Sequence, residues 1–401
     1  MPSAQQVAEA TLRDSFGRLL AYLASRTRDL ASAEDALADA FEQALRVWPE
    51  RGIPATPDAW LLTTARRRMI DQHRHRQVAA NATPALALLS QEARDSTASA
   101  FPDKRLELLF VCAHPAIDPS IRAPLMLQTV LGLDAVRIAS AFLTKPAAMG
   151  QRLVRAKRKI RDAGISFRVP DPDELAERLD AVLDAIYAAF GTGWEDTNGD
   201  AATGLAAEAI DLATVVTDLL PNEYEAKGLL ALMLYSHARR PARRDEQGSF
   251  VPLSLQDTSR WDHAMIQQAN RVLADTGESV VAGAYVLEAL IQGTHAWRAE
   301  TGSTDWNQIV RYYDALLVVA PTIGAQVSAA AAALEANGPG AALDRLDQIE
   351  HPNLGEYQPW WTVRAHALVR TGHPDAVEAV QRAAGLSSDP AIRTYLLDLL
   401  D

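Results

Sequence analysis

The densest group of chemically active side chains in this sequence is a run of cations. Residues 151–164 read QRLVRAKRKIRDAG and place six Lys and Arg side chains within ten positions. Such side chains bind the phosphates of a polyanion such as DNA, with a salt-sensitive affinity that carries little sequence information. The candidates for DNA contact in and just before this run are Lys145, Gln151, Arg152, Arg155, Lys157, Arg158 and Lys159. A charged run is often only a solvated helix face, so DNA binding needs a second observation.

A second basic run supplies that observation. Residues 65–76 read ARRRMIDQHRHR, in which only Asp71 opposes the cations. Two basic helices on separate small domains suit a protein that holds duplex DNA at two places. The candidates for DNA contact in this run are Arg66, Arg67, Arg68, Arg74 and Arg76.

Other chemistry finds little support in the sequence. It contains no phosphate-cradling Gly-rich loop, no HExxH and no GxSxG motif, and its nine histidines are scattered. His73 and His75 would point to opposite sides of a helix, which does not suit metal ligation. The single Cys112 excludes an internal disulfide and a cysteine-cluster metal site. We therefore expect no catalytic, metal or cofactor site, and a protein that is not an enzyme.

The period of the apolar residues predicts an all-α fold. Apolar residues recur at three and four positions nearly everywhere, whereas alternation with period two is scarce. Ser32 is the expected N-cap of one helix, with Asp35 three residues on as an acidic capping box. The apolar face of that helix holds Ala36, Leu37, Ala40, Phe41, Ala44, Leu45 and Trp48. Prolines and a glycine over residues 49–57 predict a loop, after which Pro57 opens the basic helix of the second run.

The longer basic run is positioned by a helix-turn-helix pattern. Residues 104–113 and 120–131 read as helices, and Gly132 precedes a third over residues 133–143. Pro146 then opens a longer, basic helix. In a helix-turn-helix unit, such a second helix enters the major groove of DNA.

Charge divides the chain into two parts. The 401 residues have a net charge of −12, but residues 1–170 carry +7 and residues 171–401 carry −19. A basic front half on an acidic back half indicates a polyanion-binding module joined to a part that does not bind polyanions. The expected parts are a domain at 1–77, a linker without sustained amphipathic pattern at 78–103, a second domain at 104–168 and a helical extension at 169–401.

The extension contains an internal repeat with a period of 34 residues. The positions that recur are Gly338 as Gly372, Ala342 as Ala376, Leu343 as Val377, Leu346 as Val380 and Leu334 as Leu368, and a weaker copy has its glycine at Gly302. A helix, a glycine turn and a helix at this period resemble tetratricopeptide repeats. Such repeats stack into an α-solenoid whose concave face commonly binds peptides or proteins.

A cluster of arginines upstream of the repeat has two interpretations. Residues 239–244 hold four arginines, and residues 245–262 hold three aspartates together with Arg260 and Trp261. They could form a ligand or partner site, or an Arg–carboxylate network that fixes a long loop on the helical stack. The sequence leaves both interpretations open.

Over roughly the first 170 residues, these motifs resemble in order and spacing the extracytoplasmic-function sigma factors, a compact class of bacterial transcription initiation factor. Residues 32–48 (SAEDALADAFEQALRVW) are similar to the family's clamp-binding segment, and residues 58–76 to its promoter-melting and minus-ten-reading segment. Residues 136–161 align with the minus-thirty-five-reading helix-turn-helix. Part of the extension resembles that of one subgroup, whose members depend on it for control in place of a membrane-bound anti-sigma factor.

The resemblance implies partners and residue roles. The helix of residues 32–48 would dock on the clamp of the largest subunit of core RNA polymerase, and the implied contacts are Asp35, Asp39, Phe41 and Gln43. Phe41 fits ordinary core packing at least as well. The loop at 49–57 corresponds to a specificity loop that captures a flipped base, although its prolines equally fit a rigid turn. Arg67 and Arg68 match polar positions of the melting helix.

Two departures from the family pattern leave the promoter sequence open. Leu143 stands where most members have glycine in the turn, and residues 148–150 stand where the recognition helix usually opens with threonine and a long polar residue. Short side chains reach base edges poorly, which leaves Gln151, Arg152 and Arg155 as the better base or phosphate contacts.

The sequence therefore predicts a sigma factor that binds core RNA polymerase and promoter DNA, with a regulatory protein partner at the extension. No run is apolar enough to cross a bilayer and the first residues lack a signal-peptide pattern, so we expect a cytoplasmic protein without membrane contact. A helix-turn-helix repressor, which would dimerise on palindromic DNA without polymerase, is one alternative. A helical-repeat interaction scaffold is another.

Overall fold

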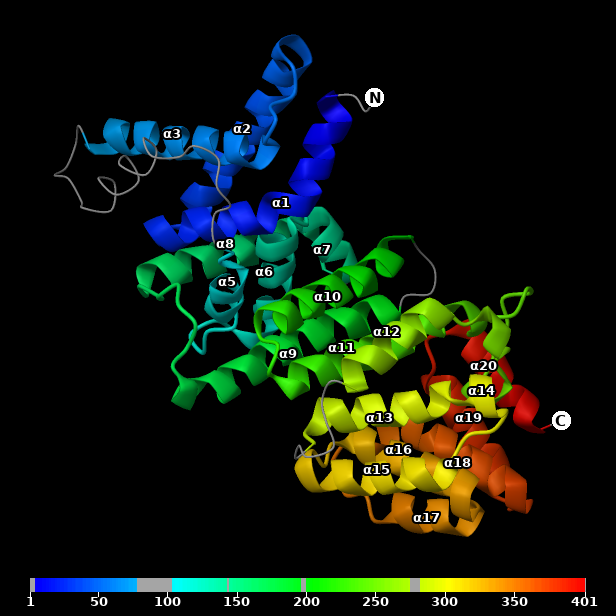
Figure 1. Cartoon of the computed structure of the whole chain (residues 1–401). Coiled ribbons are helices and arrows are strands. Elements are labelled where there is room, and N and C mark those ends of the chain that lie inside the picture. Colours follow the sequence, from blue (N-terminus) through cyan, green and yellow to red (C-terminus); the bar gives the residue numbers. More distant parts are fainter. Residues whose placement is uncertain (1–3, 78–102, 143, 196–199, 275–281, 401) are drawn as a thin grey trace. The chain divides into compact units, whose positions relative to one another are not determined.

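The computed structural model describes residues 4–77, 103–142, 144–195, 200–274 and 282–400, and this part of the chain is built from helices (Figure 1). The α-helices are α1 (Ala4–Thr27), α2 (Leu30–Arg51), α3 (Pro57–Gln77), α5 (Arg105–Cys112), α6 (Pro119–Leu131), α7 (Ala135–Ala141), α8 (Pro146–Asp162), α9 (Pro172–Glu195), α10 (Asp200–Leu219), α11 (Tyr224–Ala238), α12 (His263–Ala274), α13 (Ala284–Ala296), α14 (Arg298–Thr301), α15 (Trp306–Val319), α16 (Ile323–Asn337), α17 (Pro339–Asp347), α18 (Gln358–Thr371), α19 (Ala376–Leu386) and α20 (Pro390–Leu397). Short 3-10 turns lie at Arg240–Ala242, Leu253–Leu255, Thr258–Arg260, Leu354–Glu356 and Asp398–Leu400. The predicted all-α fold is confirmed. Within the described ranges, no helix is both long and apolar enough to span a lipid bilayer.

The chain divides into two compact units, Met1–Leu219 and Leu220–Asp401. Of the predicted linker at residues 78–103, all but Asp103 lies outside the described part of the chain.

Helix α2 begins earlier and ends later than the sequence predicts. Its N-cap is Asp29 rather than Ser32, because the Asp29 carboxylate accepts the Ser32 backbone N–H at 3.1 Å and the Ser32 hydroxyl at 2.8 Å. Pro49 does not break the helix, since a proline in the last turn removes only one hydrogen bond there. The helix ends at Gly52, whose φ of 85° is a conformation that glycine adopts without strain.

The apolar face predicted for α2 is buried, with one exception. Phe41 is 7% exposed and Trp48 is 2% exposed, whereas Leu45 is 48% exposed. The Trp48 ring meets the edge of Trp60 from α3, with 5.5 Å between the ring centroids. Helices α1, α2 and α3 pack together in this way as a small bundle.

Helices α5 to α8 follow the predicted order. Gly132 ends α6 in the left-handed conformation, with a φ of 73°, and the N–H of Leu133 bonds the carbonyl of Leu127 at 3.1 Å. Helix α7 is short, and α8 is longer and opens at Pro146. Leu143, which was expected in the turn, lies outside the described residues.

The first unit joins both predicted DNA-reading segments in one packed body. Helix α1 packs on α5 and α6, and α2 packs on α8 (Figure 1). The approach of α1 to α6 depends on Gly17, because a Cβ there would overlap the carbonyl oxygen of Val130. The first unit is therefore held by direct contact between helices far apart in sequence.

The first unit also extends past the predicted boundary near Val169. Helices α9 and α10 pack against each other and on α5 and α6. Arg178 of α9 donates to the Phe110 carbonyl at 2.7 Å, and Glu208 of α10 pairs with Arg137 of α7 at 3.1 Å. The sequence indicated where a new helix starts, but it did not indicate that α9 and α10 pack on α5 and α6.

In the second unit each helix packs on its neighbours in sequence. Contacts run from α11 to α12 and α13, from α13 to α15, and onward through α16, α18, α19 and α20. This order is typical of helical repeats, in which each pair stacks on the next. The predicted repeat positions Leu334 and Leu368 are 5% and 3% exposed, and Gly338 and Gly372 both have positive φ at helix ends. Val377 departs from the pattern, being 49% exposed, while its counterpart Leu343 packs on the core.

The loop that holds the arginine cluster is fixed at three points, two of them by arginines of the cluster. Arg244 pairs with Asp389, and Arg260 donates to the Arg244 carbonyl at 2.9 Å. Arg298 of α14 donates to the Gln256 carbonyl at 2.9 Å. These contacts support the loop-fixing interpretation for Arg244 and Arg260.

Candidate nucleic-acid interface

Helix α8 divides its residues between a buried face and a basic face. Met149, Leu153 and Ile160 are buried and hold the helix on the unit. Proline at the first position and Lys145 as N-cap begin the helix. Among the residues of α8 and its N-cap that are predicted to contact DNA, five are exposed: Lys145, Gln151, Arg155, Arg158 and Lys159. These side chains can reach phosphates without any change in α8.

Arg152 is held in place beside this face. Its guanidinium donates to the Ser120 hydroxyl at 2.8 Å and to the Ser120 carbonyl at 3.2 Å. Asp118, the N-cap of α6, accepts the Ser120 hydroxyl and backbone N–H, and these hydrogen bonds lower the pKa of its carboxyl. Arg152, Arg155 and Lys159 line one hollow of about 310 Å³ with Asp118. The hollow gathers three cations at the start of the predicted reading face.

Lys157 does not belong to the basic face. It is 8% exposed, and its ammonium group pairs with Glu34 of α2. Lys157 falls on the helical stripe of Leu153 and Ile160, which a helical projection of the sequence could have revealed. While α8 packs on α2, Lys157 is therefore not accessible to DNA, contrary to the prediction.

The basic run of α3 is divided in the same way. Arg66 is 4% exposed, donates to the Tyr22 hydroxyl at 2.7 Å and lies over the Tyr22 ring at 5.0 Å, so it is a core residue and not a DNA contact. Arg67 and Arg68 are exposed. The side chains of Arg74 and Arg76 lie outside the described part of the structure.

An ion pair links helices α2 and α3 of the N-terminal bundle. Arg68 of α3 donates to the Asp39 carboxylate of α2 at 2.6 Å, which raises the pKa of the Arg68 guanidinium. Both side chains are partly exposed, at 57% and 36%, so the pair orders the surface more than it stabilises the fold. Asp39, Gln43, Arg67 and Arg68 line one hollow of about 300 Å³ between the helices.

The residues predicted for polymerase contact have different environments. Asp35 and Gln43 are exposed on α2, while Asp39 is engaged by Arg68. Phe41 is buried, which supports the core interpretation for that residue. Asp35 and Gln43 are thus the members of the predicted set best placed to meet a partner.

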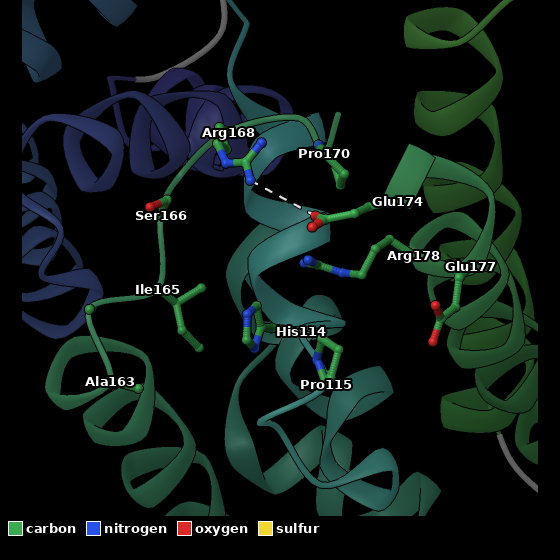
Figure 2. A pocket seen from close by; sticks show the side chains of 11 residues that line it. His114, Pro115, Ala163, Ile165, Ser166, Arg168, Pro170, Glu174, Glu177 and Arg178 are labelled. Atoms are coloured by element: carbon green, nitrogen blue, oxygen red, sulfur yellow. Dashed lines mark ion pairs between the residues drawn. The ribbon is translucent and has the colours of Figure 1, made fainter. Parts of the chain in front are cut away.

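A polar hollow that the sequence did not indicate lies where the segment after α8 meets α9 (Figure 2). It holds about 470 Å³, and His114, Arg168, Glu174 and Arg178 are among its lining residues. Arg168 lies 3.9 Å from the Glu174 carboxylate. Burial and the nearby Arg178 lower the pKa of His114. These residues come from three separate segments, so no local sequence signal could have joined them.

Comparison with known proteins covers most of the chain. Residues 12–78 match the family model described as Sigma-70 region 2, and residues 178–277 match a family of unknown function (DUF6596). An uncharacterized protein of Rhizobium meliloti (strain 1021) is 36% identical over 397 residues, which cover 96% of this chain and 92% of that protein. No solved structure matches the chain. The first match contains α2, α3 and their exposed polar residues, whereas α8 lies between the two matched segments.

Proposed function

We propose that this chain, which belongs to one protein family with the Rhizobium meliloti relative and carries a sigma-70 region 2 domain, is a bacterial sigma factor of the extracytoplasmic-function class. Sigma-70 proteins are transcription initiation factors rather than enzymes, and their region 2 acts with core RNA polymerase and promoter DNA. We place the protein in the cytoplasm, where polymerase works.

The observation that carries the proposal is how polar residues are sorted over the matched segment. Helix α2 exposes Asp35 and Gln43, and α3 exposes Arg67 and Arg68. An acidic helix can meet a basic protein surface while the adjacent basic helix meets phosphates. The Arg68–Asp39 ion pair marks the border between the two surfaces.

Helix α8 is proposed as the second DNA contact. Its exposed Gln151 lies in the second turn, close to the N-terminal part of a recognition helix that meets base edges, and the exposed Arg155 lies about one turn further along. A repressor would also use such a helix, but it would leave the sigma-70 region 2 segment without a role. The sigma factor proposal gives both segments a role.

The packing of α8 on α2 sets a condition for promoter reading. At about 3.4 Å per base pair, the roughly 25 base pairs between the minus-ten and minus-thirty-five elements span about 85 Å. A compact body the size of the first unit has a diameter of about 45 Å. We therefore propose that α8 leaves α2 when the chain joins polymerase. The 25 residues of 78–102 reach about 85 Å when fully extended, so their length permits this.

The helical extension is proposed as the regulatory part. The second unit stacks helices as repeat proteins do, and such stacks commonly bind peptides or proteins. Helices α9 and α10, the first part of the extension, pack on α5 and α6, so this part of the extension directly contacts the proposed promoter-reading region.

The proposal is tested by transcription with purified core polymerase from a related bacterium on a pool of genomic fragments. The full chain should create start sites that share two upstream motifs, and core enzyme alone should not. A protein that creates no shared start sites, although it binds DNA without polymerase, would favour the repressor alternative.

A further inference from the structure

A pocket in the second unit has no role in the proposed function. It lies among α11, α12, α13 and α15 and holds about 700 Å³, within the range of about 300–1,000 Å³ that is usual for small-molecule sites. Tyr235, Leu290, Trp297, Asp305 and Tyr312 are among its lining residues. They come from helices α11, α13 and α15, the junction of α13 and α14, and the turn between α14 and α15, so packing of the unit creates the pocket.

Three of the eleven described lining residues are aromatic: Tyr235, Trp297 and Tyr312. Trp297 is 61% exposed, which is unusual for so large an apolar side chain unless it serves a contact. Tyr235 is 2% exposed and its hydroxyl donates to Asn270 at 2.6 Å, which fixes its ring. A Cβ at position 293 would lie 3.2 Å from that hydroxyl oxygen, so Gly293 allows α13 to approach the ring.

The charge of the pocket is negative. Asp305 is exposed at the rim and caps α15, where one carboxylate oxygen accepts the Gln308 N–H at 2.9 Å. Among the described residues that line the pocket there is no Lys, Arg or His. Arg298, the neighbour of Trp297, does not line the pocket. Its guanidinium donates a hydrogen bond to the Gln256 carbonyl and lies over the Trp261 ring, 5.2 Å from the ring centroid.

We propose that this pocket binds a small organic cation with a flat apolar body. Aromatic faces carry negative charge density and attract cations, and a carboxylate at the rim adds to the same preference. An anion of the same shape would meet repulsion from both. The inference rests on the second unit alone and does not depend on the sigma factor proposal.

The test uses two fluorescent dyes of similar three-ring shape and opposite charge. Pyronin Y is a cation and resorufin is an anion near pH 7.5. Titration of either dye with the full chain is followed by fluorescence anisotropy. Pyronin Y should give a saturable rise and resorufin should not.

Three variants locate the binding. Trp297→Ala should weaken pyronin Y binding roughly tenfold, while Trp297→Phe should retain most of it because the aromatic face remains. Asp305→Asn should weaken binding roughly fivefold and keep the helix cap, since asparagine caps as well as aspartate. Asp344→Asn, an exposed acid on α17 outside the pocket lining, is the matched control and should have no effect. Circular dichroism checks that each variant is folded.

Several results would overturn the proposal. These are no saturable pyronin Y binding up to a dissociation constant of about 1 mM, equal binding of resorufin, or equal losses in Asp305→Asn and Asp344→Asn. The last result would mean that the dye binds non-specifically to the acidic surface of the protein and not to this pocket.

Discussion

The ammonium group of Lys157 on α8 and the carboxylate of Glu34 on α2 form an ion pair inside the first unit. The two side chains are only 9% and 20% exposed, and the residues are 123 positions apart in the chain. The pair thus joins the helix proposed to read DNA to the helix proposed to bind polymerase. Charges withdrawn from water in this way depend on each other, because removing one leaves the other buried and unpaired.

Removing one member of this pair should loosen α8 from α2. We expect Glu34→Gln to weaken the packing by about 2 kcal/mol, less than for a fully buried pair because both side chains keep some exposure. Hydrogen exchange of α8 backbone amides in the full chain would measure the effect. The double variant Glu34→Met with Lys157→Met removes both charges and should exchange like the wild type. Unchanged exchange in Glu34→Gln would show that the ion pair does not hold α8.

Reversing charge on the exposed face of α8 should abolish promoter-dependent transcription. Arg155→Glu with Lys159→Glu leaves the buried face of α8 untouched, so the fold should remain. Each single change should reduce the salt slope of promoter binding by the polymerase complex by about 0.9, the value for one phosphate contact. Arg271→Glu, exposed on α12, is the control and should leave the slope unchanged. Full transcription by the double variant would exclude α8 as the DNA-reading helix.

The position of truncation should decide whether the first unit stays folded. A chain of residues 1–219 keeps α9 and α10 on α5 and α6, whereas a chain of residues 1–170 exposes those surfaces and loses the Arg178–Phe110 hydrogen bond. We expect the longer fragment to unfold cooperatively and the shorter one to melt at a clearly lower temperature. Thermal unfolding by circular dichroism measures this. Equal melting temperatures would place the end of the folded unit near residue 169 after all.

The second unit should lose stability in mild acid because of His295. Burial, followed by Arg239 and Arg298, lowers the pKa of this histidine to about 3. The unfolded chain binds the proton near the ordinary value of about 6.5, so acid below that value favours unfolding, by about 2 kcal/mol at pH 5. Urea unfolding of the full chain, followed by tryptophan fluorescence from pH 7.5 to 5, should show this loss. In His295→Gln the loss should be smaller by that amount, and parallel pH curves for the two proteins would contradict the assignment.

Local signals account for what the sequence predicted well. Pro57 and Pro146 begin helices α3 and α8, and Gly132 ends α6, because each residue acts on the backbone at its own position. Leu334 and Leu368 are both buried, because each lies on a helix that packs on its neighbours in sequence.

Contacts between distant segments account for what the sequence missed. Arg66 and Lys157 sit in basic runs, yet their partners Tyr22 and Glu34 lie 44 and 123 residues away. Helical periodicity points both side chains toward the interior of the unit. The number of charges in a run does not show the direction in which each side chain points. The packing of α9 and α10 on the first unit is a long-range contact of the same kind.

Binding of the full chain to purified core RNA polymerase tests the central claim most directly. The wild type should bind saturably, and Asp35→Arg should weaken binding at least tenfold by placing a cation against a basic surface. Asp35 is exposed, and none of the hydrogen bonds described above uses its side chain. Asp39→Arg would be harder to interpret, because it would also disrupt the ion pair with Arg68. Asp344→Arg makes the same change on α17 and should bind like the wild type. Absence of binding by the folded wild type, or equal binding by Asp35→Arg, would contradict the account.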